Sequence, residues 1–492
     1  MKKKRLALAS LLAASMLLPA CSSGSGEEPV NNAGKEEAVK TTKLTMWIRT
    51  WDNLPYFQEA VDSFNKANPD INVEIVSFNP DQYNPAMQAA VNGGELPDLF
   101  QPFDQMNMYQ LKENNLIQPL PVDEAFTKQF DEGTWWEGVT SIDGQPYGFP
   151  DSSFKDPRII LYYNKKLMKD AGLDPEAPPK TWNELYAQAK TIQEHTEGKS
   201  FGLAQPMKAD WFNNVLSQLL ATSVSYDNTF VLNGERFFFN FKDGSLFDKD
   251  ALVESNAFIK RFIDDELMLP DYLLMDPPTA AAQFGEGNAA FTMTGYWFLR
   301  TFLNDYPDLD FGVAALPAKS NPVVAGTWGG SPNPFYLSSK TENKEAVKKL
   351  LDHFTKEYYP LLVKNQQNLS PIASVNNDAN LNISPQFKDY IKLVNDTVRL
   401  QPSPLVRNSA EAQVMTDIRS QPIKESLGKM IQQYMSSDSY DLAKAFDQYG
   451  KMTQEQFEAA LNKVEGSSKD NWKFANWNIS EDYSMKKYEE LK

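Results

Sequence analysis

Cysteine, histidine and basic residues are scarce in this chain. Its 492 residues include one cysteine and two histidines, and 65 Asp and Glu outnumber 48 Lys and Arg, giving a formal charge of −17. A lone cysteine cannot form an internal disulfide, and two histidines without a cysteine partner cannot build an ordinary structural zinc site. The acidic excess disfavours a nucleic-acid-binding protein. The 41% of hydrophobic residues suffice for about two or three buried cores.

The N-terminus is typical of a bacterial export signal. A basic stretch at residues 2–5 precedes an apolar stretch at residues 6–20, which is too short to span a bilayer. The sequence Leu18-Pro19-Ala20-Cys21 resembles a lipobox, in which the cysteine thiol is lipidated and becomes the mature N-terminus. We therefore expect a lipoprotein signal peptide at 1–20 and palmitate-type acylation of Cys21. The alternative is a free thiol in a soluble exported protein.

The body of the chain has the pattern of an α/β protein. Residues 21–42 are polar and aperiodic, which predicts a flexible tether. Beyond it, strand-like and helix-like spacings alternate: strands at 44–48, 71–75 and 98–100, and helices at 57–64 and 86–91. This order predicts a parallel sheet, and ligands of such sheets lie at the carboxyl ends of the strands, here residues 47–51 and 101–104.

A second lobe is expected after residue 156. Residues 159–163 form a continuous apolar strand, and Thr181-Trp182-Asn183-Glu184 is a capping box that opens a helix. Further strands are predicted at 289–294 and 311–316, and a helix stripe at 346–354. The C-terminal part is mainly helical in pattern.

An ordered set of short motifs runs from residue 44 to about residue 355. Its members are Leu44-Thr45-Met46-Trp47, Phe64-Asn65-Lys66-Ala67-Asn68-Pro69-Asp70-Ile71, Gly94-Glu95-Leu96-Pro97-Asp98-Leu99-Phe100, Asp143-Gly144-Gln145-Pro146-Tyr147-Gly148, Leu161-Tyr162-Tyr163-Asn164-Lys165, Pro179-Lys180-Thr181-Trp182-Asn183-Glu184-Leu185, Phe284-Gly285-Glu286-Gly287-Asn288-Ala289-Ala290-Phe291, Gly295-Tyr296-Trp297, Phe311-Gly312-Val313-Ala314-Ala315-Leu316-Pro317 and Gly329-Gly330. Together they resemble the bacterial extracellular solute-binding protein family 1, the maltose-binding-protein-like carbohydrate receptors of ABC importers.

The resemblance implies a two-lobed periplasmic-binding-protein-like fold of the class II type. Its lobes are discontinuous and joined by hinge crossings, with the ligand cleft between them. By this analogy lobe 1 comprises 43–156 plus 314–340, and lobe 2 comprises 157–313 plus 341–492. The implied function is a lipid-anchored protein on the outer face of the cytoplasmic membrane, which captures a carbohydrate, expected to be an oligosaccharide, by hinge closure and delivers it to the permease subunits of an ABC transporter. No catalytic residue, cofactor, metal or nucleic acid is expected, and we expect a monomer.

Aromatic and polar side chains near the strand ends are the candidate ligand-binding residues. Sugars present apolar C–H faces on which rings stack, and hydroxyl edges that polar side chains bind. Trp211 and the pair Tyr296-Trp297 are candidates because they match the family pattern. The full set of candidates is Trp47, Arg49, Trp51, Gln101, Asp104, Tyr147, Asp151, Trp211, Tyr296, Trp297 and Trp328. Arg49, Lys155, Arg158 and Arg300 would suit an acidic sugar, so the charge and the length of the ligand stay open.

Other motifs in the sequence indicate other functions only weakly. The glycines at 285 and 287 superficially match a dinucleotide fingerprint, but they precede a predicted strand and do not open a helix. His195 and His353 lie in helical stretches and do not indicate a catalytic triad. The alternating Asn and Asp residues at 376–382 lack the glycine and glutamate of a calcium loop. A cell-surface glycan-cleaving enzyme, with a carboxylate pair such as Asp151 and Asp156, and a binding subunit for a membrane sensor remain alternatives.

Overall fold

The computed structural model describes residues 41–49, 53–225, 239–242, 245–246, 249–330, 333–421 and 424–491. The export signal, Cys21, most of the predicted tether and Trp51 lie outside the described residues. None of the described helices is long and apolar enough to cross a membrane.

The first sheet contains the predicted parallel unit. Its spatial order is β2 (Ile71–Phe78), β1 (Thr42–Arg49), β3 (Leu99–Phe100), β15 (Phe335–Ser338) and β4 (Ile117–Gln118), with β7 (Gly148–Phe149) also pairing with β15. β1 runs parallel to β2 and β3, as the pattern of strands and helices predicts. β15 is antiparallel to β3, β4 and β7, and it comes from a segment far along the chain.

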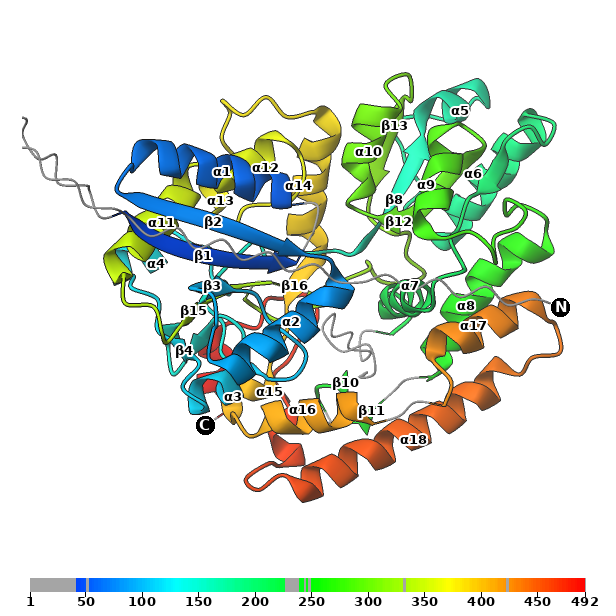
Figure 1. Cartoon of the computed structure of the whole chain (residues 1–492). Helices are drawn as coiled ribbons and strands as arrows, with labels where there is room; N and C mark the ends of the chain where they lie inside the picture. The colour runs from blue at the N-terminus through cyan, green and yellow to red at the C-terminus, as the bar shows by residue number, and fades with distance from the viewer. Residues whose placement is uncertain are drawn as a thin grey trace, which may run out of the picture. The chain divides into compact units, whose positions relative to one another are not determined.

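Successive side chains of β1 point to opposite faces of this sheet, and helices cover both faces. Leu44, Met46 and Ile48 are buried beneath α1 (Leu54–Ala67), whereas α2 (Pro80–Gly93) covers the opposite face (Figure 1). Asn79 caps α2 by accepting a hydrogen bond from the backbone N–H of Gln82.

The helices α11 (Lys344–Lys356) and α12 (Tyr358–Lys364) share the buried core of α1 and the first sheet. The stacked rings of Phe57 and Tyr358, 3.7 Å between centroids, join α1 to α12. The resemblance placed residues 341–492 entirely in lobe 2, but the packing groups these two helices with the first sheet, because their apolar stripes face α1. We therefore propose that lobe 1 extends to about residue 364.

The second sheet has the order β13 (Phe311–Ala314), β8 (Ile159–Asn164), β12 (Ala289–Gly295) and β9 (Phe201–Leu203). Every residue of β8 is buried, as its continuous apolar sequence predicts. The helices of this part are α5 (Lys165–Asp170), α6 (Trp182–His195), α7 (Asp210–Thr222), α8 (Lys249–Asp264), α9 (Pro277–Gly285), α10 (Phe298–Asp305), α14 (Pro385–Thr397) and α17 (Leu427–Ser436). The predicted capping box of Thr181 and Glu184 is present at the start of α6.

Strands β14 (Ala325–Thr327) and β16 (Val398–Leu400) pair in parallel, and Ala325 and Val398 pack in the core of the second sheet. A third core contains Leu400 of β16 together with Val324 and Trp328, which flank β14. It also contains α15 (Pro404–Arg407), α16 (Glu411–Ser420), the C-terminal part of α18 (Leu442–Lys463) and the residues after it. The remaining elements are α3 (Met108–Glu113), α4 (Glu124–Thr127), β5 (Ser141–Ile142), β6 (Gln145–Pro146), β10 (Phe239–Asn240), β11 (Ser245–Leu246), α13 (Ala373–Asn376), a 3-10 helix (Lys469–Trp472) and α19 (Met485–Glu489).

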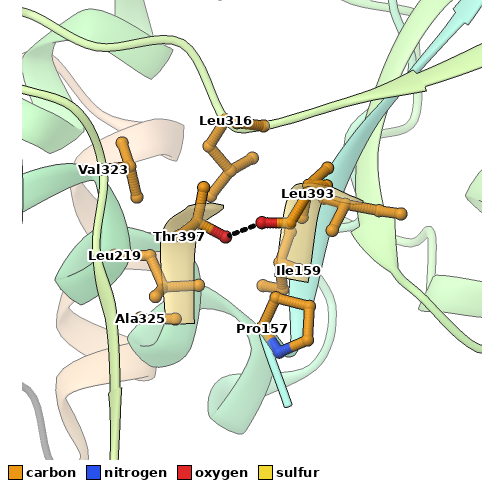
Figure 2. A pocket seen from close by; sticks show the side chains of 10 residues that line it. Pro157, Ile159, Leu219, Leu316, Val323, Ala325, Leu393 and Thr397 are labelled. Atoms are coloured by element: carbon orange, nitrogen blue, oxygen red, sulfur yellow. Dashed lines mark hydrogen bonds between the residues drawn. The ribbon is translucent and has the colours of Figure 1, made fainter. Parts of the chain in front are cut away.

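The chain passes between the two sheets more than once. It leaves the first sheet after β7 and enters β8, and it returns from β13 to β15 through β14. Apolar side chains of these crossing segments meet α7 and α14 around a small pocket (Figure 2), whose lining includes Pro157, Leu219, Leu316, Val323 and Leu393. The contacts around this pocket are almost entirely aliphatic, whereas the crossing segments are also joined by hydrogen bonds, such as the one from the Thr327 hydroxyl to the carbonyl of Phe154.

Candidate functional site

Four segments of the first sheet meet at one edge. β1 ends at Arg49, and Gln101 follows β3, which runs parallel to it. β7 runs antiparallel to β15, so Asp151, which follows β7, lies at the same edge as Asn333, which precedes β15. This is the carboxyl edge of the parallel strands, where ligands of open α/β sheets bind.

Hydrogen bonds join these side chains into one network. The backbone N–H of Arg49 donates to Oε1 of Gln101 at 2.9 Å, and Nη2 of Arg49 donates to Oδ1 of Asn333 at 2.9 Å. Nε2 of Gln101 donates to the carbonyl of Asn333 at 3.4 Å, and the backbone N–H of Asn333 donates to Oδ1 of Asp151 at 3.3 Å. The structure thus brings Arg49, Gln101 and Asp151 together, and Asn333 is their common partner.

Aromatic side chains support this polar network. The Arg49 guanidinium lies 5.5 Å from the centre of the Tyr83 ring, and the Tyr83 hydroxyl donates to the carbonyl of Gln101 at 2.8 Å. Burial raises the pKa of Tyr83 above its usual range, so this hydroxyl stays protonated and donates. Asp151 is only 4% exposed, and its carbonyl accepts a hydrogen bond from Tyr358.

The second sheet presents an aromatic cluster at the end of β12. Trp297 packs on Gly295, where an added Cβ would stand 2.2 Å from the indole ring. The Trp297 ring lies 6.1 Å from that of Trp211, at the start of α7, and 5.5 Å from that of Tyr296. Trp211 is 42% exposed, which is unusual for so large an apolar side chain. An exposed ring beside a half-buried one offers a stacking surface to a ligand.

Hydrogen bonds connect the aromatic cluster to the first sheet's helices. The Tyr296 hydroxyl donates to Oδ1 of Asn368 at 2.9 Å, and Nδ2 of Asn368 donates to Oδ1 of Asn53 at 3.3 Å. Arg300 donates from Nη1 to Oε1 of Gln367 at 2.7 Å. These contacts join α10 and the end of β12 to the residues beside α1 and α12.

The other candidate residues have packing partners. Trp47 packs against Phe78, with 4.9 Å between ring centroids, and Tyr147 is buried in the core beneath α2 and α3. Asp104 is exposed and accepts a 2.6 Å hydrogen bond from Asn84. Trp328 is buried in the third core.

Asn333 and Asn368 were not identified from the sequence. Asn333 follows the predicted Gly329-Gly330 motif, but nothing in its neighbours marks it as a site residue. Its role depends on β15 inserting antiparallel between β3 and β4, which local periodicity does not reveal.

Two of the cations that would suit an acidic ligand, Arg158 and Arg300, already have partners in the structure. Arg158 lies 3.4 Å from the carboxylate of Asp156, and Arg300 is bound to Gln367. Burial raises the pKa of Asp131, and the charge of Lys155 opposes this shift. Because Arg158 lies beside its carboxylate, Asp156 is held by a cation, which does not favour it as half of a catalytic carboxylate pair.

The two histidines and the glycines at 285 and 287 take the positions that their sequence context predicts. His195 is exposed at the end of α6, and Nε2 of His353 lies 2.7 Å from Oγ of Ser63, between α11 and α1 and away from the sheet edge. The glycines at 285 and 287 precede β12 as expected. Within the described ranges, no group of three or more His, Cys, Asp or Glu could hold a metal ion.

Comparisons with known proteins agree with this architecture. The family model described as bacterial extracellular solute-binding protein matches residues 50–357. A putative binding protein of Brucella abortus (strain 2308) is 26% identical over 325 residues, which cover 63% of this chain and 71% of that protein. The sn-glycerol-3-phosphate-binding periplasmic protein UgpB of Yersinia pestis bv. Antiqua (strain Antiqua) is 30% identical over 306 residues, which cover 59% of this chain and 65% of that protein.

Among solved structures, maltose-bound MalE3 of T. maritima aligns with a TM-score of 0.61 at 18% identity, covering 84% of this chain and 100% of that one. This likeness shows the two-lobed α/β fold of maltose-binding-like proteins. The family match spans most of both sheets described above, and the chain belongs to the family of bacterial extracellular solute-binding proteins.

Proposed function

We propose that this protein binds a carbohydrate between its two lobes and delivers it to the permease of an ABC importer. The proposal rests on two surfaces with complementary chemistry, one at the end of each sheet. The end of the first sheet presents the linked polar groups of Arg49, Gln101, Asp151 and Asn333. The end of the second presents the Trp211 and Trp297 rings. Polar groups for hydroxyls and rings for C–H faces are what a sugar requires.

A ligand that touches both surfaces would stabilise the closed state by its differential affinity for it. Capture followed by release to a permease needs no bond making, so we propose no enzymatic role. The glycan-cleaving alternative requires turnover, and Asp156, one member of its candidate pair, is held by Arg158.

A phosphorylated polyol is the second candidate ligand, because UgpB of Yersinia pestis binds sn-glycerol-3-phosphate. Phosphate recognition uses clustered cations. In the polar network Arg49 is accompanied by the buried carboxylate of Asp151, which would repel a dianion. The network therefore favours a neutral, hydroxyl-rich ligand, although an acidic sugar bound through Arg49 alone is compatible with it.

We also propose that the mature protein begins at lipidated Cys21 and stays at the outer face of the cytoplasmic membrane through its acyl chains. This rests on the lipobox-like sequence and on the position of the only cysteine in the chain. Treating cells with a lipoprotein signal-peptidase inhibitor tests it. Accumulation of the precursor at higher mass supports the anchor, and normal processing contradicts it.

The function is tested by titration calorimetry and thermal unfolding of residues 22–492 against neutral and acidic mono- and oligosaccharides, with sn-glycerol 3-phosphate in the same panel. One-to-one binding of a sugar that raises Tm without forming product supports the proposal. Preference for the phosphate ester would select the second candidate, and product formation would select the enzyme. A stable protein complex formed without sugar would instead indicate the sensor subunit.

A further inference from the structure

One chain of hydrogen bonds connects the aromatic cluster of the second sheet to the polar network of the first. The Tyr296 hydroxyl donates to Oδ1 of Asn368 at 2.9 Å, and Nδ2 of Asn368 donates to Oδ1 of Asn53 at 3.3 Å. A side-chain hydrogen bond joins Asn53 to the Tyr358 hydroxyl, which itself donates to the carbonyl of Asp151 at 2.9 Å. Asp151 belongs to the polar network, so hydrogen bonds run without a break from one candidate surface to the other.

Asn368 lies where two crossing segments of the chain meet. It follows α12, and its neighbour Leu369 packs in the core of the second sheet. The carbonyl of Leu369 accepts a hydrogen bond at 2.9 Å from the backbone N–H of Ser153, which belongs to the segment between β7 and β8. The Asn368 amide therefore stands beside the crossings and reaches residues of both lobes.

Each partner of Asn368 is held by packing within its own lobe. The Tyr296 ring stacks on that of Tyr390, with 5.5 Å between centroids, and meets the Trp297 ring edge-on at 5.5 Å. Asn53 is the residue before α1 and is only 7% exposed. Because neither partner is a loose surface side chain, a change in the angle between the lobes must strain or break the two bonds of Asn368.

A second contact joins the same parts of the molecule. Nη1 of Arg300, in α10, donates to Oε1 of Gln367 at 2.7 Å, and Gln367 is only 6% exposed. The Arg300 guanidinium also lies 5.8 Å from the centre of the Tyr56 ring of α1. This link does not involve Asn368, so it should keep the lobes joined and folded when the bonds of Asn368 are removed.

We propose that Asn368 is a positioning residue that sets the distance between the two ligand-binding surfaces. Its bonds to Tyr296 and Asn53 keep the aromatic cluster and the polar network at a fixed separation before a ligand arrives. A ligand that contacts both surfaces then requires less reorganisation, because the binding-competent arrangement is already populated. The effect of Asn368 on affinity rests on the proposed function, whereas its effect on the distance between the lobes does not.

The test measures the distance between the lobes in the ligand-free protein. Residues 22–492 contain no cysteine, because the only one in the chain is Cys21. Spin labels can therefore be attached at Glu59→Cys in α1 and Ala187→Cys in α6, which are both exposed positions. Asn368→Leu removes both bonds and keeps a similar side-chain volume. We expect it to give a longer mean distance and a broader distribution than the wild type, and a bound sugar should restore the wild-type distance.

Asn365→Leu is the matched control. Nδ2 of Asn365 donates to the carbonyl of Leu361 at the end of α12, so this variant loses a bond within one lobe and should keep the wild-type distance. Tyr296→Phe removes the hydroxyl that Asn368 accepts from and should also lengthen the distance. Added to Asn368→Leu, it should lengthen the distance no further, because the shared bond is already lost. A wild-type distribution in Asn368→Leu, or additive effects of the two changes, contradicts the inference.

Ligand titration gives the second measurement. Asn368→Leu should weaken sugar affinity about fivefold, because part of the binding energy must then bring the surfaces together. If the wild type binds sugar and Asn368→Leu binds it equally well, Asn368 does not position the surfaces and the inference fails. If the wild type binds no sugar in the panel, the proposed function fails, while the distances still decide whether Asn368 fixes the lobes.

Discussion

Nη2 of Arg49 lies 2.9 Å from Oδ1 of Asn333, which joins the end of β1 to a residue 284 positions later. The contact exists because β15 inserts antiparallel beside β3, so that its start and the ends of β1 and β3 share one edge. Asn333 thereby orients a long, flexible cation that would otherwise sample many rotamers. A ligand at this edge would meet a guanidinium already held in place.

Replacing Asn333 by Ala is therefore expected to weaken ligand binding more than it weakens the fold. The side-chain acceptor for Arg49 is lost, while the backbone N–H to Asp151 remains. Affinity should fall about tenfold, with a stability change below about 1 kcal/mol. Calorimetric titration and thermal unfolding measure the two effects. Asn114→Ala, which removes an exposed hydrogen bond to the carbonyl of Gln110, is the control and should bind normally.

Replacing Trp211 of the second lobe by Ala should weaken sugar binding and leave stability almost unchanged. The Trp211 ring is 42% exposed and loses little packing when it is removed. Its stacking surface beside Trp297 is lost, so sugar affinity should fall about tenfold. Trp135→Ala is the control. The Trp135 ring packs 5.0 Å from that of Phe130, and its indole N–H donates to the carbonyl of Thr127. This variant should therefore be less stable than the wild type but should bind sugar with the same affinity. Unchanged affinity in Trp211→Ala would remove this ring from the site.

Gly295→Ala should displace the Trp297 ring, since the new Cβ would overlap it. Overpacking of this kind costs about 1–3 kcal/mol of stability and should reduce sugar affinity as well. Intrinsic tryptophan fluorescence and denaturant unfolding report the two effects. Gly93→Ala, at the end of α2, meets only Glu95 Cγ at 3.9 Å and should be neutral. If Gly295→Ala is as stable as the wild type, the Trp297 ring can move away from the new Cβ without loss of stability.

Asp417 predicts a pH-dependent contribution to stability. Nζ of Lys463 lies 2.7 Å from its carboxylate, and this contact, followed by Gln413, lowers the pKa of Asp417. A lowered carboxyl pKa contributes stability that is complete at neutral pH and is lost as pH falls through the lowered value. Asp417→Asn should lower stability at pH 7, and the difference should shrink as the pH falls from neutral through the lowered pKa of Asp417.

Denaturant unfolding across this pH range measures the effect, and Asp396→Asn is the matched control. Asp396 pairs with Lys392 on the surface of α14, with both side chains more than half exposed. Its replacement should change stability little at any pH. Equal losses in both variants would contradict a special role for the Asp417 pair between α16 and α18.

Local pattern was enough to predict β1, β2, β3, β8, β12 and β13 and several of the helices packed on them, and one rule about strand ends led to part of the candidate site. Arg49 and Gln101 are candidates because they follow parallel strands, and they do meet at one edge. Asn333 could not be found in this way, since its place depends on a strand inserted from a distant segment. Trp47 and Tyr147 are aromatic candidates on the same grounds as Trp211, because a large ring suits a core as well as a cleft. Only the structure shows that Trp47 and Tyr147 pack in a core whereas Trp211 is exposed.

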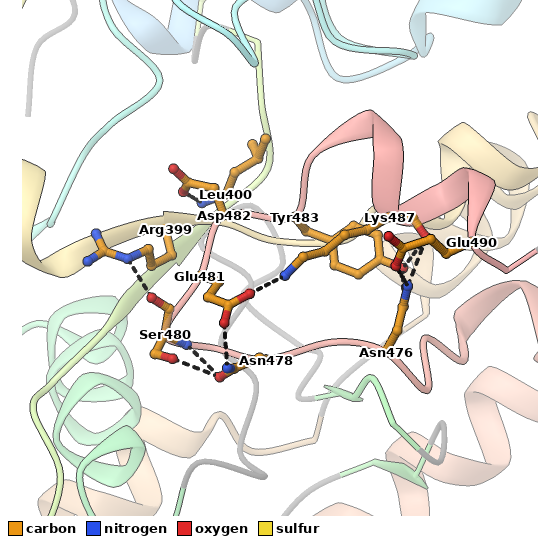
Figure 3. A network of polar contacts seen from close by, with 10 residues as sticks. All are labelled: Arg399, Leu400, Asn476, Asn478, Ser480, Glu481, Asp482, Tyr483, Lys487 and Glu490. Carbon is orange, nitrogen blue, oxygen red and sulfur yellow. Dashed lines mark hydrogen bonds and ion pairs between the residues drawn. The ribbon is translucent and has the colours of Figure 1, made fainter.

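The hydrogen bonds from the C-terminal segment to β16 join parts of the chain that lie far apart in the sequence. Asp482 accepts from the backbone N–H of Leu400 at 2.7 Å (Figure 3), and the Tyr488 hydroxyl accepts from that of Ser403 at 2.7 Å, in each case across more than 80 positions. Both sheets have all their strands before residue 339. Cutting the chain after α18 would therefore leave every strand of both sheets in place and still remove the bonds that secure the end of β16.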